Sequence, residues 1–520
     1  MSEGGPSRRA LTLLAELPPA VMAAGTLALF LQTVRGRIHY PFDLEWMEGG
    51  MLLHAKRVLD GLPLFVEPSP DFIPYLYPPL YSWVVAALTW LPGVELTMGL
   101  GRLVSVLGTL AAAGALVAAA RQERAPWGLA LGGAGLYLSC YDESGAFYDL
   151  VRIDGLFMAL LTWALVAARG GRVRAAGLLL TLAYATKHNG AAFGLPVLVW
   201  LAMARGRAEA TRFALWSVGP ALAFTAAMTA LSHGQFLTWL LLVPSSHGMV
   251  ANRLFPGALR EMVGGLPWVV GASALIGLAW ARRWSAGGAY WVANGALALV
   301  LCSIMRGHTG GFLNVLMPGQ WTLSLLGVMA LSALARRLPR PPVALAAVGA
   351  LVAAQLYLGR WQPRTYLPTA TDERVGWELV ERIRQIDGEV LSPYAPYLPV
   401  LAGKTPYFHL IALWDIDHKD GPYLAASRAV DAALAEHRWA AVLVTSKADF
   451  GHGLREHYKR GDRLNVGPNQ FMPKTGWRAR PQLIYVPRDG ADAPDAQEAP
   501  DAEDPPGPDD EGAAPAAPPE

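Results

Sequence analysis

Residues 98–120 read MGLGRLVSVLGTLAAAGALVAAA, a run in which Arg102 is the only charged residue. A membrane-spanning helix needs about 20 mostly apolar residues to cross a hydrocarbon core of roughly 30 Å. Comparable runs recur along the first 358 residues, so the sequence predicts an all-α polytopic membrane protein with about eleven transmembrane helices. The expected spans are residues 11–34, 98–120, 127–141, 153–168, 173–186, 191–204, 213–231, 266–281, 289–305, 313–335 and 343–358.

The overall composition agrees with this interpretation. Of the 520 residues, 53% are hydrophobic and 16% are charged, which excludes a disordered protein and a nucleic-acid-coating protein and argues against one soluble domain. The formal net charge of +2 hides an uneven distribution, because residues 489–520 contain 11 acidic residues and no Lys or Arg. The remainder therefore has 43 basic residues against 30 acidic ones. The two cysteines lie in apolar runs and predict neither a disulfide framework nor a metal site.

The positions of the arginines predict the orientation, because short loops rich in Lys and Arg stay in the cytoplasm. Along the eleven expected spans, the arginine clusters fall on alternate loops if residues 78–91 form a juxtamembrane or re-entrant helix. If that run crosses the membrane, the early topology changes and the number of spans rises. With an odd number, the region after residue 358 lies outside the cytoplasm. The clusters are Arg8 and Arg9; Arg121 and Arg124; Arg169, Arg172 and Arg174; Arg205, Arg207 and Arg212; Arg282 and Arg283; and Arg336, Arg337 and Arg340.

The loops on the opposite side are longer and richer in acids, histidines and aromatic residues. They comprise residues 35–97, 142–154, 232–265 and 306–314. Loops that a rigid scaffold holds in place are where binding and catalytic groups tend to lie. The candidate site is therefore expected on the outward face of the membrane.

Three acids, Asp43, Glu45 and Glu48, follow the first expected span within the sequence YPFDLEWMEGG at residues 40–50. Carboxylates this close to a membrane are costly unless they are solvated, paired or used. A partly desolvated carboxylate has a raised pKa and could act as a general base toward an alcohol. The acids could instead form a solvated helix end or bind a divalent cation. Asp154, in the second outward loop, is expected to support them.

Basic and polar groups are expected on the same face. Each Lys or Arg near a helix end could simply extend toward the lipid headgroups. Several that converge could bind a phosphate and neutralise charge as it leaves. The candidates for binding a donor phosphate are Lys56, Arg57, Arg152, Lys187, His188, Arg253, Arg306 and His308, and Tyr77 and Asn314 are further site candidates.

Residues 359–488 have the composition of a soluble domain. Helical patterns at 372–386 and 429–436 alternate with strand-like runs, which predicts a small extracytoplasmic α/β domain. The expected strands are residues 389–392, 441–445 and 482–486. Residues 489–520, rich in Ala, Pro and acids, are expected to be a disordered tail.

At these motifs the chain resembles the bacterial polyprenyl-phosphate-sugar-dependent glycosyltransferases of the GT-C superfamily, which include protein O-mannosyltransferases and lipid A aminoarabinose transferases. Residues 1–358 match its transmembrane layout. The local matches are the acidic loop with Asp43, Glu45 and Glu48; Tyr77-Pro78-Pro79-Leu80; Arg152-Ile153-Asp154; Thr186-Lys187 with Gly190; and His308-Thr309-Gly310-Gly311 with Asn314.

The resemblance implies a catalytic aspartate in the first outward loop and inversion at the anomeric carbon. The family commonly has an adjacent Asp-Glu pair, whereas Leu44 separates Asp43 from Glu45 here. We expect Asp43 to be the base, with Glu45 or Glu48 as its helper.

The resulting hypothesis is a hexosyl- or pentosyltransferase of the bacterial cytoplasmic (inner) membrane. Its partners would be membrane lipids, a polyprenyl-phosphate sugar and an acceptor hydroxyl of a lipid, glycan or protein. No cofactor is required by the sequence, although a divalent cation could bind, and no nucleic-acid partner is expected. A transporter or flippase of lipid-linked glycans is the alternative, and a non-catalytic scaffold is a third class.

Overall fold

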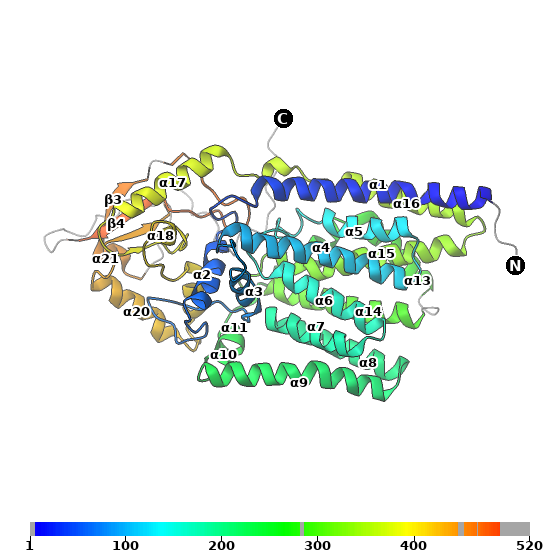
Figure 1. Cartoon of the computed structure of the whole chain (residues 1–520), viewed down its shortest axis with the longest axis horizontal. Helices are drawn as coiled ribbons and strands as arrows, with labels where there is room; N and C mark the ends of the chain where they lie inside the picture. Colours follow the sequence, from blue (N-terminus) through cyan, green and yellow to red (C-terminus); the bar gives the residue numbers. More distant parts are fainter. Residues whose placement is uncertain (1–5, 281–284, 446–451, 465, 468, 489–520) are drawn as a thin grey trace.

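A computed structural model describes residues 6–280, 285–445, 452–464, 466–467 and 469–488. The molecule is elongated, with a helical bundle at one end and a small sheet at the other (Figure 1). The tail expected at residues 489–520 and the cluster of Arg282 and Arg283 lie outside the described residues.

Every stretch expected to span the membrane coincides with a helix of the bundle. Six of the described helices are long and apolar enough to cross a membrane, so the chain is a multi-pass membrane protein. The number of eleven spans stays a prediction, because several of the other helices are shorter. The bundle helices are α1 (Pro6–Arg37), α4 (Met98–Gln122), α5 (Trp127–Ser139), α6 (Asp154–Arg169), α7 (Val173–Thr186), α8 (Gly194–Ala204), α9 (Arg207–Leu231), α13 (Pro267–Trp280), α14 (Ala286–Gly307), α15 (Met317–Arg337) and α16 (Pro341–Leu358).

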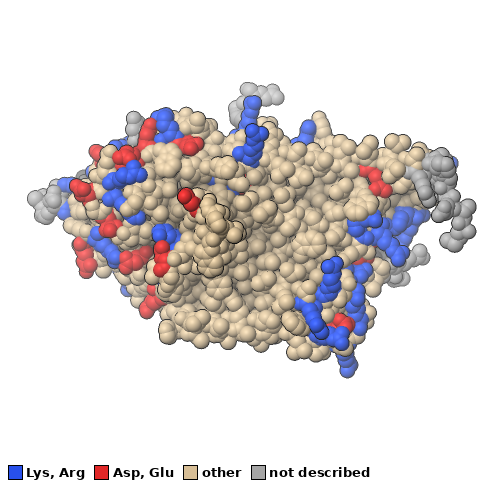
Figure 2. All heavy atoms as spheres, viewed as in Figure 1, with Lys and Arg blue, Asp and Glu red and all other residues tan. Residues whose placement is uncertain are grey.

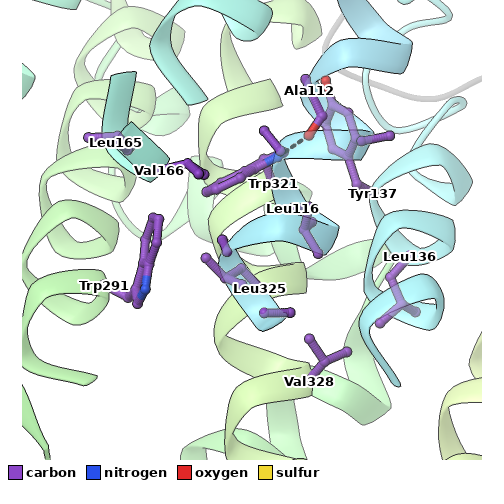
Figure 3. Packing of buried hydrophobic residues seen from close by; sticks show 14 of the residues in the cluster. Ala112, Leu116, Leu136, Tyr137, Leu165, Val166, Trp291, Trp321, Leu325 and Val328 are labelled. Carbon is purple, nitrogen blue, oxygen red and sulfur yellow. Dashed lines mark hydrogen bonds between the residues drawn. The ribbon is translucent and has the colours of Figure 1, made fainter. Parts of the chain in front are cut away.

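Small residues and one central tryptophan set the packing of the bundle. A Cβ atom on Gly108 of α4 would lie 2.4 Å from the backbone of Gly155 in α6, so glycine at both positions lets these helices touch. Trp321 of α15 is buried in the centre and donates from Nε1 to the carbonyl of Ala112 at 2.9 Å (Figure 3). The contact at Gly155 fixes the start of α6, where Asp154 lies.

Charge is unevenly distributed over the surface. On the face shown in Figure 2, Lys and Arg gather at the end of the bundle far from the sheet, and a nearly uncharged band separates them from the mixed charges around the sheet. Such a band is what a lipid-facing surface requires. Four of the predicted arginine clusters lie close together, because Arg336 donates to the carbonyl of Arg124 and Arg205 donates to the carbonyl of Arg169, both at 3.0 Å.

Short elements connect the bundle to the sheet region. Helix α3 has nine residues, about 13 Å, and cannot cross a membrane. This short length agrees with the juxtamembrane or re-entrant helix expected at residues 78–91, whose position relative to the membrane stays a prediction, and α3 begins directly after the Pro78-Pro79 pair. The short elements are α2 (Glu48–Leu59), α3 (Leu80–Leu88), η1 (His188–Phe193), α10 (Gln235–Leu237), η2 (Thr238–Leu242), α11 (Val243–Ser245), η3 (Ala251–Arg253), α12 (Gly257–Gly264) and η5 (Leu313–Leu316).

The C-terminal region contains a four-stranded sheet of order β1-β2-β4-β3. Strand β1 is parallel to β2, and β4 pairs antiparallel with both β2 and β3. The predicted strands correspond to β1, β2 and β4, whereas β3 was missed because its sequence YKRGDR is polar and mostly exposed. The elements are η6 (Pro363–Thr365), α17 (Ala370–Gln385), β1 (Val390–Leu391), α18 (Leu398–Leu401), α19 (Leu410–Ile416), α20 (Leu424–Ala435), β2 (Ala441–Val444), α21 (Leu454–His457), β3 (Tyr458–Arg463) and β4 (Leu483–Pro487).

The C-terminal region packs against the loop that joins α1 to α2. Glu45 and Thr475 form a parallel β-bridge, and the backbone N–H of Lys474 donates to the carbonyl of Leu44 at 2.7 Å. Side chains from both regions share one buried apolar cluster. A segment close to the end of the described chain therefore lies against the loop that carries the predicted acids.

Candidate active site

A cavity of about 420 Å³ lies between the ends of the bundle helices and the C-terminal region. Its wall combines apolar side chains with a few charged ones, the usual composition of a small-molecule site. Of the predicted site residues, seven line it: Glu45, Tyr77, Arg152, Lys187, His188, His308 and Asn314.

A buried ion pair organises the loop that carries the acids. Glu48 and Arg102 are both fully buried, with Arg102 Nη2 2.7 Å from Glu48 Oε2 and Nε 2.9 Å from Oε1. Burial alone would raise the pKa of Glu48, but Arg102 and its hydrogen bonds hold that pKa below the usual value. The pair also binds the surrounding backbone: Arg102 donates to the carbonyls of Arg37, Tyr40 and Phe42, and Glu48 accepts from the N–H groups of Leu44 and Val151.

Glu45 is the first-loop acid that reaches the cavity. Its Oε2 lies 3.3 Å from Arg152 Nη1, and Arg152 Nη2 donates to the hydroxyl of Tyr77 at 3.1 Å. Burial raises the pKa of Glu45 to about 7, although the charge of Arg152 opposes the rise. A carboxyl group with such a pKa is well matched to proton abstraction near neutral pH.

A second charged group lies where α6 and α7 meet. Lys187 Nζ is 2.8 Å from Asp154 Oδ1, and the Asn314 amide donates to Asp154 Oδ2 at 3.0 Å. Asp154 is 2% exposed and Lys187 6%. Asp154 thus connects α6 to the segments that carry Lys187 and Asn314 and orients these two residues, both of which line the cavity.

Three polar atoms in the cavity wall are buried and have no hydrogen-bond partner within the described part of the chain. They belong to three different segments: Arg152 Nε, His188 Nδ1 and the hydroxyl of Tyr75. An unsatisfied buried polar group costs about 1–3 kcal/mol, so these residues lose stability that the rest of the fold must offset. Burial lowers the pKa of His188 to about 4, so its ring is neutral near pH 7.

The other predicted residues lie away from the cavity wall. Asp43, the expected base, accepts a hydrogen bond from the Gly49 N–H at 2.5 Å, and burial raises its pKa well above the usual range. Glu48 points into its pair with Arg102. The remaining cations have local partners: Lys56 pairs with Asp60, Arg57 donates to the Pro63 carbonyl, Arg306 pairs with Glu261, and Arg253 is buried in η3.

The C-terminal region adds wall residues that the sequence did not predict. Ile411 and Asp415 of α19 and the Gly476-Trp477 pair line the cavity. A Cβ atom on Gly476 would lie 2.8 Å from Glu45 Oε1, and the φ of Gly476 is +68°, so glycine is needed there. A one-dimensional pattern carries no signal for such a contact, since Gly476 and Glu45 are far apart in the chain.

Metal binding by clustered acids was one expected alternative. Among the described residues, no group of three or more His, Cys, Asp or Glu side chains is arranged to hold a metal ion. Asp43, Glu45 and Glu48 point in different directions, toward Gly49, Arg152 and Arg102 respectively.

Solved structures with the same arrangement are known. The chain aligns with ArnT from Cupriavidus metallidurans in the apo state at a TM-score of 0.57 and 15% identity, over 90% of this chain and 97% of that one. The chain has the GT-C fold. The resemblance that the sequence motifs indicated is therefore confirmed at the level of the fold.

Two further structures share the GT-C fold. ArnT from the same organism bound to undecaprenyl phosphate aligns at a TM-score of 0.53 with 13% identity, over 90% of this chain and 97% of that chain. The arabinofuranosyltransferase AftD from Mycobacteria aligns at 0.50 with 18% identity, over 94% of this chain but 42% of that chain. No family profile and no curated protein sequence matches the chain.

Proposed function

We propose that the chain is an inverting glycosyltransferase that transfers a sugar from a polyprenyl phosphate to an acceptor hydroxyl on the outer face of the bacterial cytoplasmic membrane. The proposal depends on one observation: the carboxyl group of Glu45 shares a cavity with Arg152 and Lys187. A base and cations in one site match a reaction that removes a proton and releases a phosphate. The GT-C fold and the undecaprenyl phosphate bound to ArnT support this class of donor.

In the proposed reaction, Glu45 accepts the proton of the acceptor hydroxyl. The acceptor oxygen forms a bond to the anomeric carbon from the side opposite the phosphate, so the configuration inverts. The bond between that carbon and the phosphate oxygen breaks, and its electron pair stays with the phosphate. Arg152 and Lys187 stabilise the departing negative charge, and Tyr77 and Asp154 orient these two cations.

Glu45 is proposed as the base in place of Asp43, which was expected from the sequence. Glu45 lines the cavity, whereas the carboxyl group of Asp43 accepts from a backbone N–H beside α2. Asp43 and Glu48 are assigned to shaping the loop. His188, whose ring is neutral near pH 7, and His308 both line the cavity and are proposed to contact the donor.

The proposed orientation places the arginine-rich end of the bundle in the cytoplasm and residues 359–488, as an outward domain, with the cavity on the opposite side. The transporter alternative is less well supported. Transport sites usually have ionisable groups near the membrane midplane, between broken helices. Here Arg152, Asp154 and Lys187 lie at helix ends.

The experiment compares cells that contain wild type, Glu45→Gln or Glu67→Gln. Glu67→Gln is the control, because Glu67 is an exposed acid of the same loop. Mass spectrometry of envelope lipids, glycans and glycoproteins is expected to detect a product with one additional sugar in cells that contain wild type or Glu67→Gln. Cells that contain Glu45→Gln should lack this product. Native mass spectrometry of the purified proteins should detect bound undecaprenyl phosphate in all three. An unchanged product with Glu45→Gln contradicts the assignment of the base, and transbilayer movement of lipid without a new glycosidic bond favours the transporter.

A further inference from the structure

The cavity has two walls of different chemistry. The wall formed by the bundle ends carries Arg152, Lys187 and His188, while the C-terminal region contributes Asp415 and Trp477. If the first wall binds the donor phosphate, as proposed above, the second is free to bind the other substrate. The following inference therefore rests on the proposed function and concerns the acceptor.

Three tryptophans form a rigid aromatic surface at this second wall. The rings of Trp46 and Trp477 are 4.8 Å apart at their centroids, and those of Trp414 and Trp477 are 5.3 Å apart. Trp46 is 4% exposed and is fixed further by His409, whose Nε2 bonds to its carbonyl at 2.9 Å. Trp46 and Trp477 both line the cavity with their ring planes 81° apart, so the half-buried Trp477 ring forms an apolar part of this wall.

Asp415 supplies a hydrogen-bond acceptor beside this surface. Its side chain is 20% exposed, and His247 Nε2 is 3.9 Å from Oδ1, beyond hydrogen-bond distance. Burial lowers the pKa of His247 to about 4, so that ring is neutral and does not form an ion pair with Asp415. The carboxyl group therefore has acceptor capacity directed at the cavity.

An aromatic face next to a carboxyl group matches one kind of acceptor. A sugar ring offers a flat C–H face that packs on an indole, and hydroxyl groups at its edge that donate to the carboxyl group of Asp415, whose pKa burial raises to about 7. An acyl chain has no donor for Asp415, and an extended peptide would need backbone partners. We propose that Trp477 and Asp415 form an acceptor subsite whose ligand is a saccharide.

The position of the subsite suits the transfer. Gly476, which precedes Trp477, lies against the Glu45 carboxyl group, because a Cβ atom there would be 2.8 Å from Glu45 Oε1. A sugar packed on Trp477 therefore has its edge next to the proposed base. One short segment both limits the space around Glu45 and supplies the surface that binds the acceptor.

The test is saturation-transfer-difference NMR on the purified full chain in detergent micelles. The probes are methyl glycosides of common hexoses and pentoses and the corresponding disaccharides, with a serine- and threonine-containing peptide as comparison. We expect one or more saccharides to give a signal with wild type, and binding to weaken about tenfold in Trp477→Ala and in Asp415→Asn. Trp477→Phe should retain most of the binding, and Trp90→Ala, at an exposed position outside the cavity wall, should not change it.

Folding and donor binding are measured on the same samples. Thermal unfolding identifies any variant that fails to fold. If Trp477→Ala fails to fold, Asp415→Asn, which keeps the size of the side chain, still tests the subsite. The inference is overturned if no saccharide binds wild type, if both variants bind as wild type does, or if the peptide alone gives a signal. Bound undecaprenyl phosphate, detected by native mass spectrometry, should survive in both variants. Its absence from wild type would refute the proposed donor and leave the saccharide result to be judged separately.

Discussion

Arg102→Met tests whether the buried ion pair maintains the loop that joins α1 to α2. The substitution removes two charge-assisted hydrogen bonds to Glu48, at 2.9 and 2.7 Å, and leaves a carboxylate that is completely buried. It also removes the donors to the carbonyls of Arg37, Tyr40 and Phe42. Deleting one partner of a buried ion pair lowers the free energy of unfolding by about 3–5 kcal/mol, because the other charge is left uncompensated.

The assay is equilibrium unfolding of the purified protein in mixed micelles, followed by tryptophan fluorescence. The matched control is Lys56→Met, which breaks an exposed pair with Asp60 on the neighbouring helix α2 and should cost less than about 1 kcal/mol. A double variant, Glu48→Met with Arg102→Met, should lose less stability than Arg102→Met alone, because no buried charge remains. If Arg102→Met and Lys56→Met lose equal stability, the pair does not hold the loop and our account of how Glu45 is placed is wrong.

Three further predictions concern the chemistry of the cavity. Glu45→Gln should lower the rate of sugar transfer by about 10²–10⁴-fold, whereas Asp43→Asn should lower it much less; equal losses in a product assay would contradict the choice of base. A base acts in its deprotonated form, and burial raises the pKa of Glu45 to about 7. The rate of sugar transfer should therefore fall as the pH drops below about 7 and level off above it. A rate that does not change between pH 5 and pH 8 would count against Glu45 as the base. Gly476→Ala should lower the free energy of unfolding by about 1–3 kcal/mol because the φ of Gly476 is positive. The added methyl group should also displace Glu45 and so reduce sugar transfer. A variant with normal stability and activity would disprove the contact.

The sequence predicted the membrane elements well for a physical reason. A lipid environment demands long apolar runs with internally satisfied backbone groups, and residues 98–120 satisfy that demand without help from tertiary structure. The helix expected within residues 78–91 begins directly after the Pro78-Pro79 pair, since proline fixes φ and suits the first turn of a helix. Strand β3 was missed because an exposed edge strand can be polar, and its pairing with β4 overrides its weak strand pattern.

The candidate site was predicted less completely. The motifs identified Arg152, Lys187 and Asn314, whose positions at helix ends follow from the spans themselves. The choice between Asp43 and Glu45 depends on which way each side chain points in one irregular loop, and no periodicity encodes that. Asp415 and Trp477 lay beyond sequence reasoning, because they join the cavity only through the packing of the C-terminal region on that loop.

The β-bridge between Glu45 and Thr475 has a consequence for how the protein matures. The two residues are 430 positions apart, so at roughly 5–20 residues per second the ribosome needs about 20–90 s to reach the second after making the first. During that interval the bundle helices can insert, but the loop with Glu45 lacks the backbone partners at Leu44 and the close contact with Gly476. If the proposed function holds, sugar transfer begins only after the C-terminal region has been made and has docked on this loop.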